Sequence, residues 1–383
     1  MEAIDWSTAQ RIGELVAGSP PFGGVRLASV ESLVRDFAER VGTYSGLEVS
    51  EELPQLELVD RPGWIAANLK TMRPMLAPLS APLELGSGPL AGPLRSATGL
   101  VLGAQVGALA GVLSKRVLGQ YDVALLDSQV RPRLLLLAPN LAEAARALAV
   151  DRDEFVLWVS IHEVTHAVQF SGAPWLRAYL GGMLEELIKG LRVTVADSGD
   201  EEPVGHGAPA HRNSWMPDLS NLPKLPDMDA LREMLERARH GELLRLTLGE
   251  DRWALVERMQ AAMSLIEGHA EHMMDAVGTE VLPSLARLRA AMNHRRENHG
   301  LSWRILERLL GLELKMRQYV IGRRFCDAIV DAAGTQALAL ALSSAESLPN
   351  LAELEDPSLW IARVAGKSAR GKPEPPGKRS TAF

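Results

Sequence analysis

Apolar residues recur every three to four positions over most of the chain, the spacing of one face of an α-helix. This pattern predicts helices over residues 8–16, 30–41, 64–76, 141–149, 230–248, 251–277, 283–291 and 303–334. The second of these is expected to end near Gly42. A further helix is predicted over about 151–170, because Asp151 followed by Glu154 resembles a helix-start signal. Gly172 and Pro174 mark its expected end.

Two short apolar runs, residues 121–126 and 133–138, have a different character. They are too short for good helices and are separated by polar residues, so we interpret them as a pair of strands. The proline-bounded segment 54–62 is interpreted as a polar connection, and the Pro-, Gly- and Ser-rich segment 77–93 as a loop. The sequence therefore predicts a mainly α fold with a small β-sheet.

The most apolar segment, residues 97–113, carries no charge and has a glycine at every fourth position: Gly99, Gly103, Gly107 and Gly111. A glycine stripe down one helix face lets another helix approach closely. The segment lies at the short end for a membrane span, and the sequence has no second candidate. We therefore favour a buried helix, although this segment leaves membrane attachment open.

Composition narrows the function classes. Hydrophobic residues make up 46% and charged residues 23% of the 383-residue chain, as in ordinary soluble proteins, and the net charge of −7 does not favour nucleic acid as a partner. The single cysteine, Cys326, excludes an intrachain disulfide and a cysteine-rich zinc site. The N-terminus has no basic segment followed by an apolar run. We expect a cytoplasmic protein.

Residues 162–166 read His-Glu-Val-Thr-His within the predicted helix 151–170. Histidines four apart lie one helical turn from each other and can bind the same metal ion from one side. Glu163 beside them is placed to take a proton from a metal-bound water, which is the metalloprotease form of the zinc motif. The alternative is two surface histidines on an ordinary helix. We favour the metal site, because strands just before this helix suit a zincin architecture with a rim strand beside the site.

A catalytic zinc ion needs three protein ligands, so a third must come from elsewhere. Gln169 and Gly172 occupy the positions where a metzincin has its glycine and its third histidine, which excludes that subclass. The best candidate is Glu267, about a hundred residues further on. His269 is the rival, giving a three-histidine site, and we favour Glu267.

The segment around Glu267 offers further candidate roles. Glu271 shares a helix face with Glu267 and would hydrogen-bond a liganding histidine, fixing its tautomer. Gly268 has no side chain, so this helix could pack tightly on the metal helix. Arg317 and Tyr319 lie on a helix that could border the cleft, where either could stabilise an oxyanion. A solvated arginine and a packed tyrosine are the simpler interpretation of that pair.

With these motifs, the chain resembles a family of bacterial zincin-like metallopeptidases of uncharacterised substrate, often labelled as associated with deazaflavin coenzyme biosynthesis. The resemblance rests on the His-Glu-Val-Thr-His motif with its flanks and on residues 61–64, 118–122, 174–177, 267–269, 315–319 and 355–360. The segment from Glu267 also resembles the Glu-Gly-x-Ala segment of gluzincin aminopeptidases.

The family resemblance implies a single zincin-like unit over residues 1–365 with one bound Zn²⁺. We divide this unit into an N-terminal helical part, 1–120, and a metal-site part, 121–365. Within the second part, the polar segment 197–229 with its five prolines is predicted to be an exposed loop. The basic tail, residues 366–383, is predicted to be disordered.

The function expected from these features is that of a zinc-dependent hydrolase, in the first place a metallopeptidase with a peptide or protein substrate. His162, His166 and Glu267 would hold the ion, and Glu163 would act as general base. The alternatives are a zinc hydrolase of a non-peptide amide or small metabolite, and a non-catalytic metal-binding scaffold. Iron, manganese or cobalt could also bind two histidines and a carboxylate. Oligomeric state is not indicated.

Overall fold

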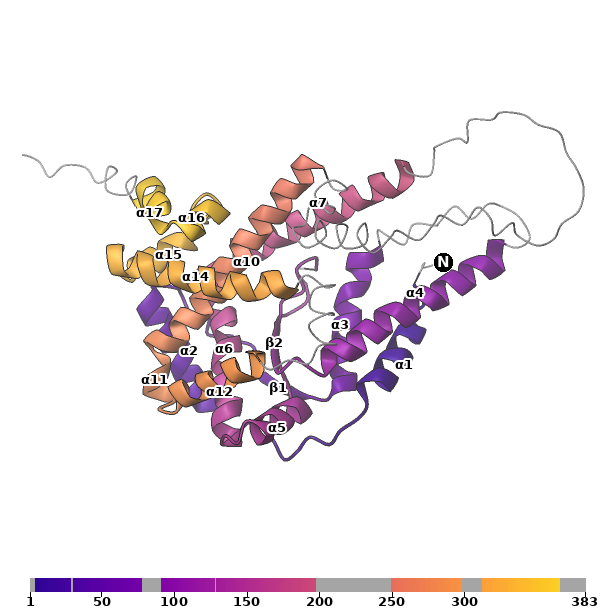
Figure 1. The fold of residues 1–383 in the computed structure, drawn as a ribbon, viewed down its shortest axis with the longest axis horizontal. Helices are drawn as coiled ribbons and strands as arrows, with labels where there is room; N and C mark the ends of the chain where they lie inside the picture. The colour runs from indigo at the N-terminus through magenta and orange to yellow at the C-terminus, as the bar shows by residue number, and fades with distance from the viewer. Residues whose placement is uncertain are drawn as a thin grey trace, which may run out of the picture.

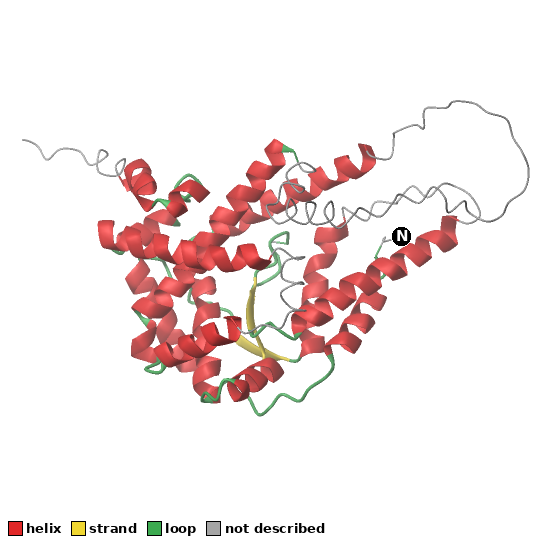
Figure 2. Cartoon of the chain, viewed as in Figure 1, coloured by secondary structure: helices red, strands yellow, loops and turns green. Residues whose placement is uncertain are grey.

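The computed structural model describes residues 4–28, 30–77, 91–127, 129–197, 249–297 and 312–365. The fold is mainly helical with one small sheet, as the sequence predicts (Figure 2). The predicted helix 230–248 and tail 366–383 lie outside the described residues, as does the predicted loop 197–229 beyond Asp197.

Most helices follow the apolar pattern, but the helix Trp175–Asp197 was not predicted, and the predicted loop 77–93 is wrong at its end, because a helix begins at Ala91. Figure 1 shows the arrangement of the helices. They are α1 (Trp6–Ala17), α2 (Glu31–Ser45), α3 (Arg61–Leu76), α4 (Ala91–Ser114), α5 (Ala138–Ala147), α6 (Arg152–Gly172), α7 (Trp175–Asp197), α10 (Glu250–Ala276), α11 (Gly278–Val281), α12 (Leu285–Glu297), α14 (Leu312–Ala333), α15 (Gln336–Ala341), α16 (Leu351–Glu355) and α17 (Pro357–Trp360), followed by a π-helical turn, Ile361–Ala365.

The predicted end of α2 near Gly42 is wrong, because the helix continues to Ser45. Gly42 serves packing instead: a Cβ there would lie 2.3 Å from Cγ2 of Val49. The helix ends at Gly46, whose φ of 74° is a left-handed conformation that glycine adopts without strain.

The sheet contains β1 (Leu56–Val59), β2 (Gly119–Asp122) and β3 (Arg133–Leu137), in the order β1-β3-β2. The antiparallel pair of β2 and β3 confirms the predicted pair of strands. The interpretation of residues 54–62 as a polar connection is wrong, because β1 pairs with β3 in parallel. Four residues are too few to show a period of two, and Glu57 within them is stabilised by Arg133 of β3 (Oε1–Nε, 3.0 Å).

The central strand β3 is buried on both faces, which explains its run of leucines. Leu134 and Leu136 belong to the larger core, together with residues of α2 and α6 such as Phe37 and Ile161. Leu135 and Leu137 belong to a smaller core with residues of α1, α3 and α4. The sheet therefore separates two helical layers, and β2 forms an edge beside α6.

The glycine stripe of α4 packs against α1, as its spacing predicts. A Cβ on Gly103, Gly107 or Gly111 would lie 2.3, 2.2 or 2.6 Å from a carbonyl oxygen of Asp5, Ala9 or Gly13. The opposite face is exposed, however: Leu100 and Val101 are 47% and 56% accessible. Within the described chain, Ser96–Ser114 is the one helical stretch long and apolar enough to cross a membrane, and a single such stretch is weak evidence.

A second glycine contact joins α10 to α14. A Cβ on Gly322 would lie 1.8 Å from the carbonyl oxygen of Ser264, and one on Gly268 would lie 2.0 Å from the carbonyl carbon of Gly322. Gly268 does allow close packing, but its partner is α14. The expectation that the partner is the metal helix is therefore wrong. The side of α10 that carries Gly268 packs on α14, whereas α6 meets α10 along another side.

We expect the substitution Gly322→Ala to lower the free energy of unfolding by about 1–3 kcal/mol, because an added methyl group in a closed contact forces the helices apart. Urea denaturation measures this difference. Gly182→Ala on α7 is the matched control, since a Cβ there meets no atom within 4 Å and alanine favours a helix. Equal midpoints for Gly322→Ala and wild type would contradict the prediction.

Candidate metal centre

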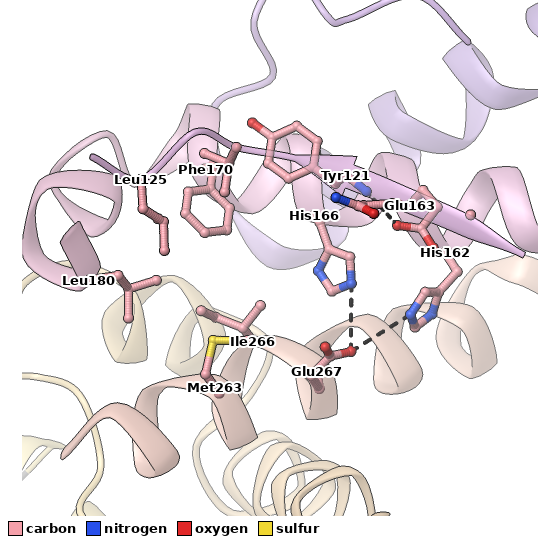
Figure 3. A pocket seen from close by; sticks show the side chains of 13 residues that line it. Tyr121, Leu125, His162, Glu163, His166, Phe170, Leu180, Met263, Ile266 and Glu267 are labelled. Atoms are coloured by element: carbon pink, nitrogen blue, oxygen red, sulfur yellow. Dashed lines mark hydrogen bonds and ion pairs between the residues drawn. The ribbon is translucent and has the colours of Figure 1, made fainter. Parts of the chain in front are cut away.

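The helix α6 carries the His-Glu-Val-Thr-His motif through the middle of the molecule. It begins where the sequence predicts, since the Asp151 carboxylate accepts a hydrogen bond from the Glu154 amide (2.9 Å). His162 and His166 lie one turn apart on this helix, with ring centroids 5.0 Å from each other and ring planes nearly perpendicular. Their side chains are therefore directed toward the same point (Figure 3).

Glu267 reaches this point from α10. Its Oε2 lies 3.8 Å from Nε2 of His162 and 3.6 Å from Nε2 of His166. These distances are too long for good hydrogen bonds. They are close to the ~3.4 Å that separates two ligands lying about 2.0–2.1 Å from a tetrahedral zinc ion. One ligand atom from each residue lies within 4.8 Å of the other two.

The donor set fits a catalytic zinc ion. Two imidazoles and one carboxylate are a known combination for such sites, and three protein ligands leave a fourth position for water or substrate. His166 and Glu267 are buried, with 8% and 6% of their surface accessible, so the ion would be shielded from bulk solvent.

Glu163 is held apart from the three converging donors by the edge strand β2. Its Oε2 accepts a hydrogen bond from the backbone amide of Tyr121 (2.9 Å). A Cβ on Gly119 would lie 2.8 Å from Cγ of Glu163, so the carboxylate occupies space that only glycine leaves. The strand therefore fixes the carboxylate beside the two histidines, where all three line one cavity.

The other predicted site residues are placed differently. His269 is fully buried, its Nδ1 lies 2.9 Å from Nε2 of Gln169, and it does not join the converging donors. Burial lowers the pKa of His269 to about 3, so its ring is neutral. Arg317 and Tyr319 lie on α14, but their side chains fall outside the described part of the structure.

Glu271 acts on the centre through its charge. It forms an ion pair with Arg289 of α12 (Oε2–Nη2, 3.1 Å). Burial alone would lower the pKa of His162, but contact with Glu267 and the charges of Glu163 and Glu271 outweigh it, so this pKa lies above its usual value.

Gln169 is a contributor that the sequence interpretation missed. Its Oε1 lies 2.9 Å from Nδ1 of His166, and its Nε2 donates to the carbonyl oxygen of Ile266 (2.7 Å). When His166 donates its Nδ1 proton to this amide oxygen, the Nε2 lone pair is left for a metal ion. The signal in the sequence is its position three residues after His166, close to one helical turn away.

We expect Gln169→Leu to lower zinc affinity about 10- to 100-fold, because it removes the group that orients His166. Competition against a chelating dye measures the dissociation constant. Gln260→Leu makes the same chemical change on α10, outside the cavity lining. Equal affinities for Gln169→Leu and this control would contradict the assignment.

A cavity of about 270 Å³ joins the metal centre to an apolar recess. Gly119, Gln120 and Tyr121 of β2 line it beside His162, Glu163, His166 and Glu267. Its remaining lining residues are all apolar: Val123, Leu125, Phe170, Leu180, Met263 and Ile266.

Comparison with known proteins identifies a family and a related fold. A family described as zincin-like metallopeptidase matches residues 4–361, which confirms the resemblance seen in the sequence and suggests a metal-dependent hydrolase. A crystal structure from Chloroflexus aurantiacus, described as a proposed hydrolase with a novel fold, shares the fold with a TM-score of 0.62. It is 24% identical, over 94% of this chain and 99% of that one. No curated protein matches significantly. The chain belongs to the zincin-like metallopeptidase family.

Proposed function

We propose that this protein is a zinc-dependent peptidase. The observation that carries the proposal is the convergence of His162, His166 and Glu267 from two helices, with the Glu163 carboxylate fixed separately beside them. A structural metal site has no use for such a carboxylate, whereas hydrolysis needs a general base.

The metal ion and the residues around it would have separate roles in hydrolysis. A bound zinc ion would supply a Lewis acid that polarises a carbonyl group and lowers the pKa of water. Glu163 would accept a proton from the attacking water and pass it to the leaving amine. The Tyr121 amide holds one oxygen of Glu163 during both transfers, because its hydrogen bond does not depend on the substrate.

The edge strand β2 favours a peptide over a small metabolite. Among the residues that the structure describes, β2 pairs with β3 alone, and the Tyr121 amide points away from β3 toward Glu163. Gly119, Gln120 and Tyr121 of this edge line the cavity, and an extended peptide could pair with the backbone groups there other than the Tyr121 amide, which Glu163 occupies. The cavity volume of about 270 Å³ is below the ~300–1,000 Å³ typical of small-molecule pockets.

The proposal is tested by the metal dependence of peptide cleavage. We expect purified protein to hold about one zinc ion per chain, as one set of three ligands implies. Treatment with a zinc chelator should abolish cleavage of an unstructured protein such as casein, and added zinc should restore it. Undiminished cleavage after complete removal of zinc would overturn the proposal.

A further inference from the structure

We propose that the apolar end of the cavity is a side-chain pocket that selects peptide bonds beside a large apolar residue, such as leucine, methionine or phenylalanine. We call it the apolar pocket; it consists of Val123, Leu125, Phe170, Leu180, Met263 and Ile266. The inference rests on the proposed peptidase function and deepens it by naming the substrate class.

The chemistry of the lining supports this selection. Four separate segments contribute the six apolar side chains, and Figure 3 shows five of them gathered to one side of His166 and Glu267. The charged and titratable lining groups belong to the metal centre itself, apart from the phenol of Tyr121. A charged substrate side chain would lose its hydration there without gaining a partner, whereas an apolar one gains from burial.

The segment after β2 forms one wall of the apolar pocket, and α7 holds this segment in place. Arg177 donates hydrogen bonds to the carbonyl oxygens of Ala124 (2.9 Å), Asp127 (2.6 Å) and Val130 (2.9 Å). One turn further along, a Cβ on Gly181 would lie 2.4 Å from the carbonyl oxygen of Leu125. Leu180 lies next to this contact, so the same helix both fixes the wall and lines the pocket.

This arrangement makes the pocket preformed. Three hydrogen bonds and a glycine contact hold the wall in place before a substrate binds. Little binding energy is therefore lost in ordering the wall when the substrate enters. The space is also limited, because the cavity of about 270 Å³ includes the volume above the metal centre. It suits one side chain and the adjoining peptide backbone.

The test uses fluorescein-labelled peptides Gly-Ala-Xaa-Ala-Gly, in which Xaa is Leu, Phe, Ala, Asp or Lys. Cleavage by the zinc-loaded wild type gives kcat/KM and the position of the cut by mass spectrometry. Binding to Glu163→Gln, measured by fluorescence anisotropy, reports on the pocket without turnover. We expect Leu and Phe to exceed Asp and Lys at least about tenfold in both measurements.

Two variants locate the preference in the pocket. Leu180→Ala and Met263→Ala enlarge it, so the ratio of Phe to Leu in kcat/KM should rise about tenfold. Leu187→Ala and Met259→Ala make the same changes on the same helices outside the cavity lining and should leave the ratio unchanged. Melting temperatures verify that all four variants are folded.

The outcomes separate the pocket from the peptidase activity. If cleavage shows no preference, or if Leu180→Ala and Met263→Ala leave the preference unchanged, the proposed pocket is wrong. The proposed peptidase activity stands in both cases. Selective binding of Leu and Phe peptides that the zinc-loaded wild type fails to cut retains the pocket as a binding site and overturns the peptidase. A peptide series that is neither bound nor cut overturns the pocket, and the peptidase is overturned with it when casein is also left uncut.

Discussion

Replacing Glu163 by glutamine is expected to lower kcat about 10²- to 10⁴-fold while zinc stays bound. The magnitude is that of a lost general base. Zinc should remain because Glu163 does not belong to the converging donors, which are His162, His166 and Glu267. Glutamine has the same shape, and its amide oxygen can still accept the hydrogen bond from Tyr121, so the site should keep its geometry.

Steady-state cleavage and zinc content, measured on the same preparation, test this expectation. Glu154→Gln is the matched control, because it makes the same change in the first turn of α6, away from the cavity. Full activity of Glu163→Gln would contradict a role as base. Loss of zinc together with activity would contradict the separation of base and ligands.

Glu267→Ala is expected to abolish zinc retention. Removing a direct ligand should lower zinc affinity by more than the ~10- to 100-fold that is typical of groups that only orient a ligand. His269→Gln should keep zinc, since the structure places His269 against Gln169 rather than among the converging donors. The pair of variants thus discriminates between a carboxylate and a third histidine.

Zinc per chain after gel filtration, measured by mass spectrometry of the metal, gives the answer. Both proteins should have similar circular dichroism spectra, so that lost zinc cannot be attributed to unfolding. Zinc retained in Glu267→Ala but lost in His269→Gln would establish the three-histidine site and overturn the present assignment.

Local patterns in the sequence were sufficient for the parts of the site that lie on one element. The spacing of His162 and His166 places them on one side of a helix, and the Asp151 cap fixes where that helix begins. The run from Arg133 also predicts a strand, because both of its faces are buried and nearly every position is apolar. The ligand and base roles of these residues stay predictions.

Relations between distant segments could not be predicted in this way. The sequence shows that Gly268 allows close packing, but its partner Gly322 follows only from how α10 crosses α14. β1 was missed because its four residues gain stability from β3, not from their own pattern. The contact of Gly119 with Glu163 likewise joins a strand to a helix that local spacing cannot relate.

The hydrogen bond from Gln169 to Ile266 has a consequence for metal exchange. It links positions 97 residues apart in the chain, and so joins α6 to α10 across a segment that includes α7. The entropy lost in closing that segment is therefore offset in part by contacts between protein groups, in addition to a bound ion. We expect the ion to enter and leave a completed framework, so that zinc exchange requires no refolding of the protein.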